Sequence, residues 1–343
     1  MNKKTFNLGT LSTYRNQIYG LATIWIMLLH GSIMDKVVTP NYMQIPHLVI
    51  SHGNVGVEIF LFLAGMGMYY SFSKDSNIRD YTIKRLVRIL VPFFVIAGSF
   101  FVYRDLYLLG NWKKFFGEIT QVAFWAKGNH LVWYIPGILV CYFIYPYLYS
   151  FFYDRKKDVN IVKLAIVLVL WIGFTYAFKQ SYGEFYNKIE ILLTRIPIFI
   201  VGSACGKAIH DKKEISALWL IPAAIVSVGA LVIIKNCKMQ LIQQRYLYFV
   251  WSIGLLFVFA FIFSVVRIKA LDIVFKWFGK YSLELYITHI LARDYFMKSP
   301  YYNGNVWNKW MVILVLCIIF VAVIGKLTAK IQKMLLGFLL KKN

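Results

Sequence analysis

The chain has 343 residues, of which 59% are hydrophobic, well above the about 45–50% that is usual in soluble domains. It carries 38 lysines and arginines against 15 aspartates and glutamates, a formal charge of +23. This composition excludes an ordinary soluble domain. The basic residues lie in short segments between apolar runs, which indicates a membrane surface rather than a nucleic-acid partner.

Apolar runs long enough to cross a hydrocarbon core of about 30 Å as helices recur along the whole chain. They are too long and too evenly apolar for barrel strands. We therefore predict an all-α membrane protein, a bundle of about ten transmembrane helices, in which residues 1–343 form a single domain with no appended soluble domain. The predicted spans are 17–34, 53–72, 89–109, 130–152, 159–178, 188–208, 215–234, 245–265, 279–297 and 306–326.

The loops differ in their content of lysine and arginine. These residues gather in alternate loops and in both terminal segments, and cytoplasmic segments carry such an excess, so we expect both termini in the cytoplasm. The first span lacks a small-residue cleavage site after it, which favours a retained helix over a signal peptide. The four cysteines form no CxxC pair, and we predict neither a metal site nor a disulfide framework.

Three spans carry an ionisable side chain where lipid makes charge costly, which marks a candidate for function. His30 lies near the end of the first span, Glu58 near the start of the second and Arg195 within the sixth. At about 1.5 Å per residue, the predicted orientation places all three at one depth. The imidazole is a candidate general base, the carboxylate would orient it, and the guanidinium would bind an oxyanion. A network that only fixes helix packing is the alternative.

Glycine and arginine mark the second span and the segment that follows it. The second span contains four glycines that would let helix backbones approach closely: Gly53, Gly56, Gly65 and Gly67. Arg85 and Arg88 then lie three residues apart on one helical face, ahead of Pro92, which kinks or begins the helix. The two arginines suit lipid headgroups or the phosphates of a nucleotide-bearing acyl donor.

The fourth and ninth spans hold the remaining candidates. His130 and Trp133 open the fourth span, where an aromatic belt is the ordinary role for the tryptophan ring. In the ninth span, Glu284 and His289 are five residues apart. This spacing separates them by about 140° on a helical wheel, so one surface would not hold both comfortably.

Six segments, taken in order, resemble the acyltransferase 3 family of integral membrane acyltransferases, which modify cell-surface glycans. They are GLATIWIMLLH, GNVGVEIFLFLAG, KRLVRILVPFF, HLVWYIPGIL, RIPIFIVGSACG and FGKYSLELYITHIL, and together they cover nearly the whole chain. The second-span and sixth-span segments are the more specific ones. The functional positions that the resemblance implies are His30, Glu58, the pair Arg85 and Arg88, Arg195, and the late motif of Ser282, Tyr286 and His289.

One position departs from the family pattern. The family has an arginine eleven residues before the first-span histidine, and this chain has Tyr19 there. Arg15 lies four residues earlier on the same helical face, from which it would reach the inner mouth of the site. We therefore expect Arg15 and Tyr19, together with Arg85 and Arg88, on the side that holds the donor.

The resemblance implies a multi-pass membrane O-acyltransferase of a bacterial cell membrane. It would move an acyl group, expected to be acetyl, from cytoplasmic acetyl-CoA to a hydroxyl of a cell-surface or exported polysaccharide. His30, assisted by Glu58, would deprotonate the hydroxyl, and Arg195 would stabilise the acyl oxyanion or position the donor. No permanently bound cofactor is implied, because acetyl-CoA is a co-substrate. The implied partners are membrane lipid, the polysaccharide acceptor, acyl-CoA and glycan-assembly proteins.

Two other classes of function fit parts of the sequence. A transporter or exporter of a polar glycan precursor or small solute would also use buried charges and glycine-rich spans, but the chain shows no inverted repeat. A membrane module that assembles with a glycan polymerase, and has no chemistry of its own, would leave buried His30 and Glu58 without a purpose.

Overall fold

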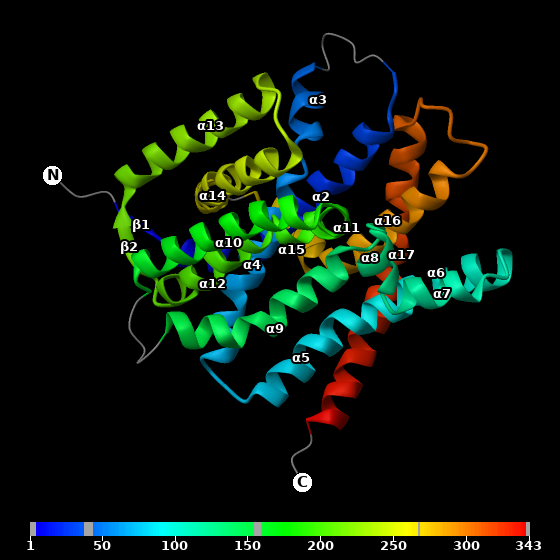
Figure 1. The fold of residues 1–343 in the computed structure, drawn as a ribbon, viewed down its shortest axis with the longest axis horizontal. Helices are drawn as coiled ribbons and strands as arrows, with labels where there is room; N and C mark the ends of the chain where they lie inside the picture. Colours follow the sequence, from blue (N-terminus) through cyan, green and yellow to red (C-terminus); the bar gives the residue numbers. More distant parts are fainter. Residues whose placement is uncertain (1–4, 38–43, 154–158, 267, 341–343) are drawn as a thin grey trace. The chain divides into compact units, whose positions relative to one another are not determined.

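A computed structural model describes residues 5–37, 44–153, 159–266 and 268–340. Nearly all of these residues are helical, and the short strands β1 (Thr5–Asn7) and β2 (Glu214–Ser216) pair antiparallel, with Phe6 opposite Ile215. The chain is an all-α membrane protein, as the sequence predicts (Figure 1). It divides into two compact units, each assembled from separate segments of the sequence.

Nine stretches of the described residues are long and apolar enough to cross a membrane: Arg15–Met34, Val55–Phe72, Ile78–Leu108, Tyr134–Phe152, Ile161–Ser181, Gly183–His210, Ala217–Asn236, Leu241–Val265 and Trp307–Leu339. Each overlaps one predicted span, and Ile78–Leu108 and Trp307–Leu339 extend beyond the predicted 89–109 and 306–326. The remaining predicted span, 279–297, corresponds to helix α16 (Ser282–Met297), whose 16 residues reach only about 24 Å. The assignment of residues 1–343 to a single domain and the cytoplasmic placement of both termini stay predictions.

Unit 1 consists of Met1–Ala22, Asn54–Ser76 and Phe143–Lys280. Besides β1 and β2, its elements are α1 (Gly9–Thr13), the start of α2 (Arg15–Met34), α4 (Val55–Phe72), the end of α9 (Tyr134–Phe152), α10 (Ile161–Ser181), α11 (Gly183–Leu193), α12 (Ile196–His210), η5 (Ala217–Trp219), α13 (Leu220–Asn236), α14 (Leu241–Val265) and α15 (Lys269–Lys280). The most extensive helix contact in this unit is between α4 and α12.

Two glycines determine how closely α4 and α12 pack. A Cβ added at Gly65 would meet the backbone carbonyl of Phe199, and one added at Gly202 would meet the backbone carbonyl of Phe62. The predicted close approach at Gly65 is therefore confirmed, and it is backbone against backbone. Because Glu58 lies on α4 and Arg195 directly precedes α12, this contact also sets the spacing of the two charged side chains.

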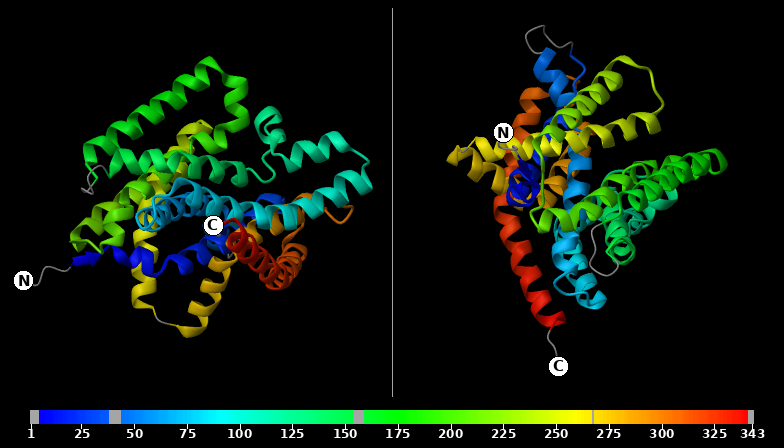
Figure 2. Two further views of the ribbon diagram at one scale, coloured as in Figure 1. Left: turned by 90° about the horizontal axis from the view of Figure 1, so that it is seen from below. Right: turned by 90° about the vertical axis from the view of Figure 1, so that its left-hand side faces the viewer.

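Unit 2 consists of Thr23–Gly53, Asn77–Tyr142 and Tyr281–Asn343. Its elements are the rest of α2, α3 (Gln44–Ser51), α5 (Ile78–Pro92), the π-helix η2 (Phe93–Gly98), α6 (Ser99–Phe101), the π-helix η3 (Val102–Leu108), α7 (Trp112–Ile119), α8 (Val122–Lys127), the start of α9, α16 and α17 (Trp307–Leu339). Helix α17, drawn in red to orange-red in Figures 1 and 2, packs against both α5 and α16.

Pro92 is the last residue of α5, and the chain continues past it directly into η2. Proline has no backbone N–H, so the carbonyl of Arg88 loses its usual intrahelical partner. Gln332 of α17 donates its Nε2 to that carbonyl at 3.3 Å. The helix then continues through η2, α6 and η3, and Ile78–Leu108 form one continuous stretch. The predicted span 89–109 is thus the second part of a longer helix.

Helix α17 also holds α2 and α16 in place. The fully buried Trp310 donates its indole N–H to the carbonyl of Met27 at 3.0 Å, and Gly31 leaves room for the same indole ring. Thr328 donates its hydroxyl to Glu284 at 3.1 Å. These contacts, one on α2 and one on α16, fix the two helices that carry the histidines of the candidate site.

The contact of α4 with α12 predicts a difference between two glycine substitutions. Gly202→Ala should destabilise the protein by about 1–3 kcal/mol, because the new methyl group would press on the Phe62 carbonyl. Gly229→Ala on α13 is the matched control, since nothing lies within 4 Å of its added Cβ. Thermal unfolding in detergent would measure both, and equal melting temperatures would contradict this account of the packing.

Candidate active site

Two histidines from distant parts of the sequence meet in unit 2. His30 lies on α2 and His289 on α16, and His30 Nδ1 is 3.0 Å from His289 Nε2. The ring centroids are 5.0 Å apart. His289 is 1% exposed, and its Nδ1 lies 2.6 Å from the carbonyl oxygen of Leu285. The first-span histidine and the late histidine, which the sequence treats as separate candidates, therefore form one hydrogen-bonded pair.

The Leu285 carbonyl determines where the protons of this pair lie. A carbonyl oxygen only accepts, so the proton of neutral His289 lies on Nδ1 and its Nε2 is an acceptor. His30 must then donate from Nδ1 to His289 Nε2. The remaining nitrogen of neutral His30, Nε2, carries no proton. The arrangement thus holds His30 in the tautomer that presents Nε2 as a base.

The other two residues of the late motif lie on the same helix as His289. Tyr286 lies one turn before His289, with ring centroids 6.1 Å apart, and its hydroxyl accepts the backbone N–H of Tyr134 at 3.3 Å. Ser282 is the first residue of the same helix. Glu284 and His289 do face different partners, since Glu284 bonds to α17 and His289 to α2.

The two candidates before α9 lie in an aromatic cluster. Trp133 is buried, with its ring centroid 6.1 Å from that of Tyr134, which itself packs on Tyr286 at 5.4 Å. His130 packs on Phe124 of α8 at 5.9 Å. Trp133 is therefore connected to the late motif through Tyr134, whereas His130 packs on α8. Functional roles for both residues stay predictions.

Glu58 and Arg195, the other two predicted catalytic groups, form a buried ion pair in unit 1. Arg195 Nε is 3.1 Å from Glu58 Oε1, and both side chains are 1% exposed. Arg195 also donates to Asn54 Oδ1 at 2.9 Å and to the Ile191 carbonyl at 3.1 Å. The guanidinium thus has a counter-charge and two further acceptors. The predicted pairing of His30 with Glu58 joins residues of different units and stays a prediction.

A second ion pair in unit 1 was not foreseen from the sequence. Arg245 Nη2 is 3.4 Å from Glu190 Oε1, and both side chains are mostly buried. Arg195 interacts electrostatically with both of these residues. Glu190 and Arg245 stand close to the ends of predicted spans, where a charged residue is ordinarily exposed to headgroups. The sequence therefore carried no signal that they are part of a buried network.

Arg15 and Tyr19 lie together in unit 1, on one face of α2 as predicted. The Arg15 guanidinium is 5.3 Å from the centre of the Tyr19 ring, and Tyr19 donates its hydroxyl to the Phe60 carbonyl at 3.4 Å. Arg15 lines a small cavity of about 260 Å³, where the absence of a side chain at Gly67 leaves room for the guanidinium. The other lining residues are Ser12, Thr13, Asn16, Met66 and Tyr70.

Arg85 and Arg88 differ in their surroundings. The Arg85 guanidinium lies over the rings of Tyr81 at 5.6 Å and Tyr142 at 5.8 Å, whereas Arg88 is exposed. Both are on α5 in unit 2. The charge of Arg85 is thus held against two aromatic rings, whereas the charge of Arg88 is open to a ligand.

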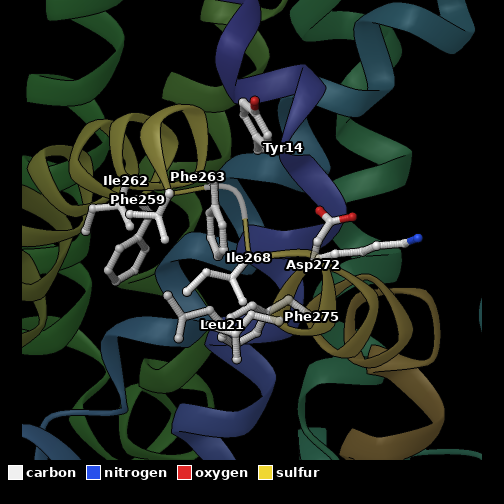
Figure 3. Close-up of a pocket in the computed structure, with 11 residues that line it drawn as sticks. Tyr14, Leu21, Phe259, Ile262, Phe263, Ile268, Asp272 and Phe275 are labelled. Atoms are coloured by element: carbon white, nitrogen blue, oxygen red, sulfur yellow. The ribbon is translucent and has the colours of Figure 1, made fainter.

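A larger cavity of about 690 Å³ lies in unit 1 and is mainly apolar (Figure 3). Phe259, Phe263 and Phe275 line it, and Asp272 lies on one side. Hydrogen bonds from Lys276 and Gln17 lower the pKa of Asp272 below its ordinary value, so this carboxylate stays charged and paired. The cavity has room for an apolar group, and the Asp272 carboxylate in its lining is already paired with Lys276 and Gln17.

A buried charge network in unit 2 was also missed. Arg104 of η3 makes a two-pronged ion pair with Asp105 at 2.7 and 2.8 Å, and it also contacts Glu118 at 3.3 Å and Asp294 at 3.2 Å. Lys114 adds a second cation, 3.1 Å from Asp105. Arg104 and Asp105 stand at the end of the predicted span 89–109, where they resemble boundary residues. Because each charge is paired, the network anchors α16 rather than forming an open site.

The Glu58–Arg195 pair predicts non-additive effects on stability. Glu58→Gln or Arg195→Gln alone should lower the unfolding free energy by about 3–5 kcal/mol, because each leaves a buried charge without its partner. The double variant should lose less than the sum of the two. Chemical unfolding in detergent measures all three, and Glu184→Gln, at an exposed position, is the control. Strict additivity would show that the pair does not interact in the folded protein.

The candidate residues other than Arg15 lie in the part of the chain that matches a known family. Residues 17–326 match the family model described as an acyltransferase domain, that of the acyltransferase 3 family. No curated protein and no solved structure matches the chain. The match includes both histidines, the buried ion pair and the late motif. The chain therefore belongs to the acyltransferase 3 family of membrane acyltransferases.

Proposed function

We propose that the protein is a bacterial plasma-membrane enzyme that moves an acetyl group from cytoplasmic acetyl-CoA to a hydroxyl of a cell-surface or exported polysaccharide. Its family supports acyl transfer in a membrane. The observation that carries the chemistry is the hydrogen bond of 3.0 Å between His30 and His289, because it leaves His30 Nε2 as an unprotonated nitrogen.

In the proposed reaction, His30 Nε2 takes the proton of the acceptor hydroxyl as its oxygen attacks the thioester carbonyl carbon. The tetrahedral intermediate collapses, the carbon–sulfur bond breaks, and the CoA thiolate takes the proton back from His30 Nε2. While His30 is an imidazolium, its Nδ1–H remains bonded to His289 Nε2. His289 is thus a positioning residue, which keeps the ring oriented and helps to disperse its transient charge.

Glu58 and Arg195 have a supporting role in this proposal. Arg195 is engaged by Glu58, Asn54 and the Ile191 carbonyl, so its guanidinium has little capacity left for an oxyanion. The pair instead holds α4 and the start of α12 at a fixed spacing. A requirement for both residues would then reflect the geometry of the spans rather than direct contact with the acyl group.

Each unit contains a candidate set of residues for binding the anionic part of the donor. Arg88 is exposed and Arg85 is held by two tyrosine rings, an arrangement that suits the phosphates and the adenine of a nucleotide. Arg15 lines a cavity with the hydroxyl-bearing residues Ser12 and Thr13. Arginine and hydroxyl groups together are ordinary ligands of phosphate oxygens.

The proposal predicts that His30→Gln abolishes acyl transfer. Membranes containing the protein would be supplied with radiolabelled acetyl-CoA and with surface polysaccharide from cells that lack the gene. Label should enter the polysaccharide with wild-type membranes and fall by at least about 10²-fold with His30→Gln, because the base is lost. His47→Gln is the control, since that imidazole bonds to Ser32 away from the pair. Normal labelling by well-expressed His30→Gln would refute the assignment of His30 as the base. In a separate transport assay, solute flux without an acyl donor would favour a transporter.

The role of His289 predicts a graded series of variants. His289→Gln keeps a side-chain acceptor for His30 Nδ1–H, whereas His289→Leu keeps the volume and removes the acceptor. We expect kcat to fall in the order wild type, Gln, Leu, by about 10²-fold for Leu, with an unchanged KM for acetyl-CoA. Steady-state rates and melting temperatures of the purified variants measure this. A Leu variant as active as the Gln variant would show that His289 does not orient the base.

A further inference from the structure

Helix α16 carries a fourth polar residue on the face that holds the late motif. Arg293 follows His289 by four residues and Tyr286 by seven, spacings that place all three side chains on one side of a helix. His289 of this face bonds to His30. The charge of Arg293 acts on both imidazoles and on Tyr286. Helical geometry therefore places a guanidinium beside His289, the hydrogen-bond partner of the proposed base.

Within the described part of the chain, Arg293 has no counter-charge at bonding distance. Among the residues that the structure describes, none forms a hydrogen bond or an ion pair with its side chain, and its Nε is buried without a hydrogen-bond partner. The adjacent carboxylate of Asp294 is engaged by Arg104 at 3.2 Å and by Lys298 at 2.7 Å. The neighbouring acid is thus directed to other cations.

Three other mostly buried arginines differ from Arg293, because each of them forms an ion pair. Arg104, Arg195 and Arg245 each contact a carboxylate, at 2.7, 3.1 and 3.4 Å respectively. A half-buried guanidinium that lacks such a partner is costly unless something negative approaches it during function. Beside a base that activates a hydroxyl, negative charge arises on the carbonyl oxygen under attack.

We propose that Arg293 binds the thioester carbonyl oxygen and stabilises the oxyanion that forms when the hydroxyl attacks. This inference rests on the proposed acyl transfer and transfers to Arg293 the oxyanion role that the sequence assigns to Arg195. As the new carbon–oxygen bond forms, the carbonyl π electrons move to the oxygen, which Arg293 faces, and the proton moves to His30 Nε2. As the carbon–sulfur bond breaks, the charge leaves the oxygen for the thiolate, and His30 protonates the sulfur.

The positive charge of Arg293 has opposite effects on a protonated imidazole and on a negative oxyanion. In the resting state the guanidinium and a protonated imidazole would repel each other, because both are positive. In the transition state the oxyanion is attracted to both the guanidinium and the new imidazolium. The charge of Arg293 therefore stabilises the charged intermediate during the reaction.

The test compares Arg293→Gln, Arg293→Lys and Arg293→Gly with Lys298→Gln, an exposed cation near the end of the same helix. With radiolabelled acetyl-CoA and the purified full-length protein, kcat should fall about 10²- to 10³-fold in Arg293→Gln, with KM values for both substrates within about twofold of wild type. The kcat of Arg293→Lys should lie between those of the wild type and Arg293→Gln, because an ammonium group supplies charge without the planar fork of donors that a guanidinium has. Guanidinium chloride below denaturing concentrations should restore part of the rate of Arg293→Gly but none of His30→Gln.

The other outcomes distinguish a failure of this inference from a failure of the proposed function. An Arg293→Gln enzyme with kcat within about twofold of wild type shows that Arg293 does not touch the oxyanion, and the proposed function survives. An increase in acceptor KM at constant kcat assigns Arg293 to an anionic group of the acceptor. A wild-type protein that transfers no acetyl group, although folded by its melting curve, removes the proposed function itself. If Arg293→Gln does not fold, the guanidinium response of Arg293→Gly and the rate of Arg293→Lys decide the question.

Discussion

The hydrogen bond from His30 to His289 is the interaction on which the functional account depends. A lone imidazole on a membrane helix exchanges between two tautomers, and its ring rotates freely. Both properties hinder a base that must present one particular nitrogen to its substrate. The Leu285 carbonyl, 2.6 Å from His289 Nδ1, sets the tautomer of the second ring and through it that of the first. A backbone acceptor thus does the orienting that a carboxylate does in many other sites.

The buried charges described above, away from the two histidines, are paired with charges of opposite sign. Unit 1 pairs two arginines with two glutamates, and the network around Arg104 in unit 2 pairs each of its cations with an acid. Buried charges that are paired stabilise or specify the packing of the helices around them. Among the described residues, Arg293 departs from this rule, because its half-buried guanidinium forms no ion pair, and a departure from a local rule is expected at a functional site.

The sequence predicts what depends on local pattern and fails where the outcome depends on a distant partner. Apolar runs predict the spans, and the wheel angle between Glu284 and His289 correctly separates their surfaces. The pairing of His289 with His30 joins residues far apart in the chain. The pattern of apolar residues along one helix does not predict which other helix will lie beside it. Pro92 is similar, because the helix passes it with the help of Gln332 on another helix. Arg104 and Asp105 were missed because they resemble boundary residues until α7 and α16 fold against them.

The most direct test of the central claim is a measurement of the protonation state of the two ring nitrogens of His30. Protein labelled with ¹⁵N-histidine and placed in lipid nanodiscs would be studied by solid-state NMR at neutral pH, with His30→Gln used to assign the resonance. We expect a protonated Nδ1, an unprotonated Nε2 and a through-hydrogen-bond coupling from Nδ1 to the Nε2 of His289. A His30 ring protonated on Nε2, or one without coupling to His289, would contradict the account.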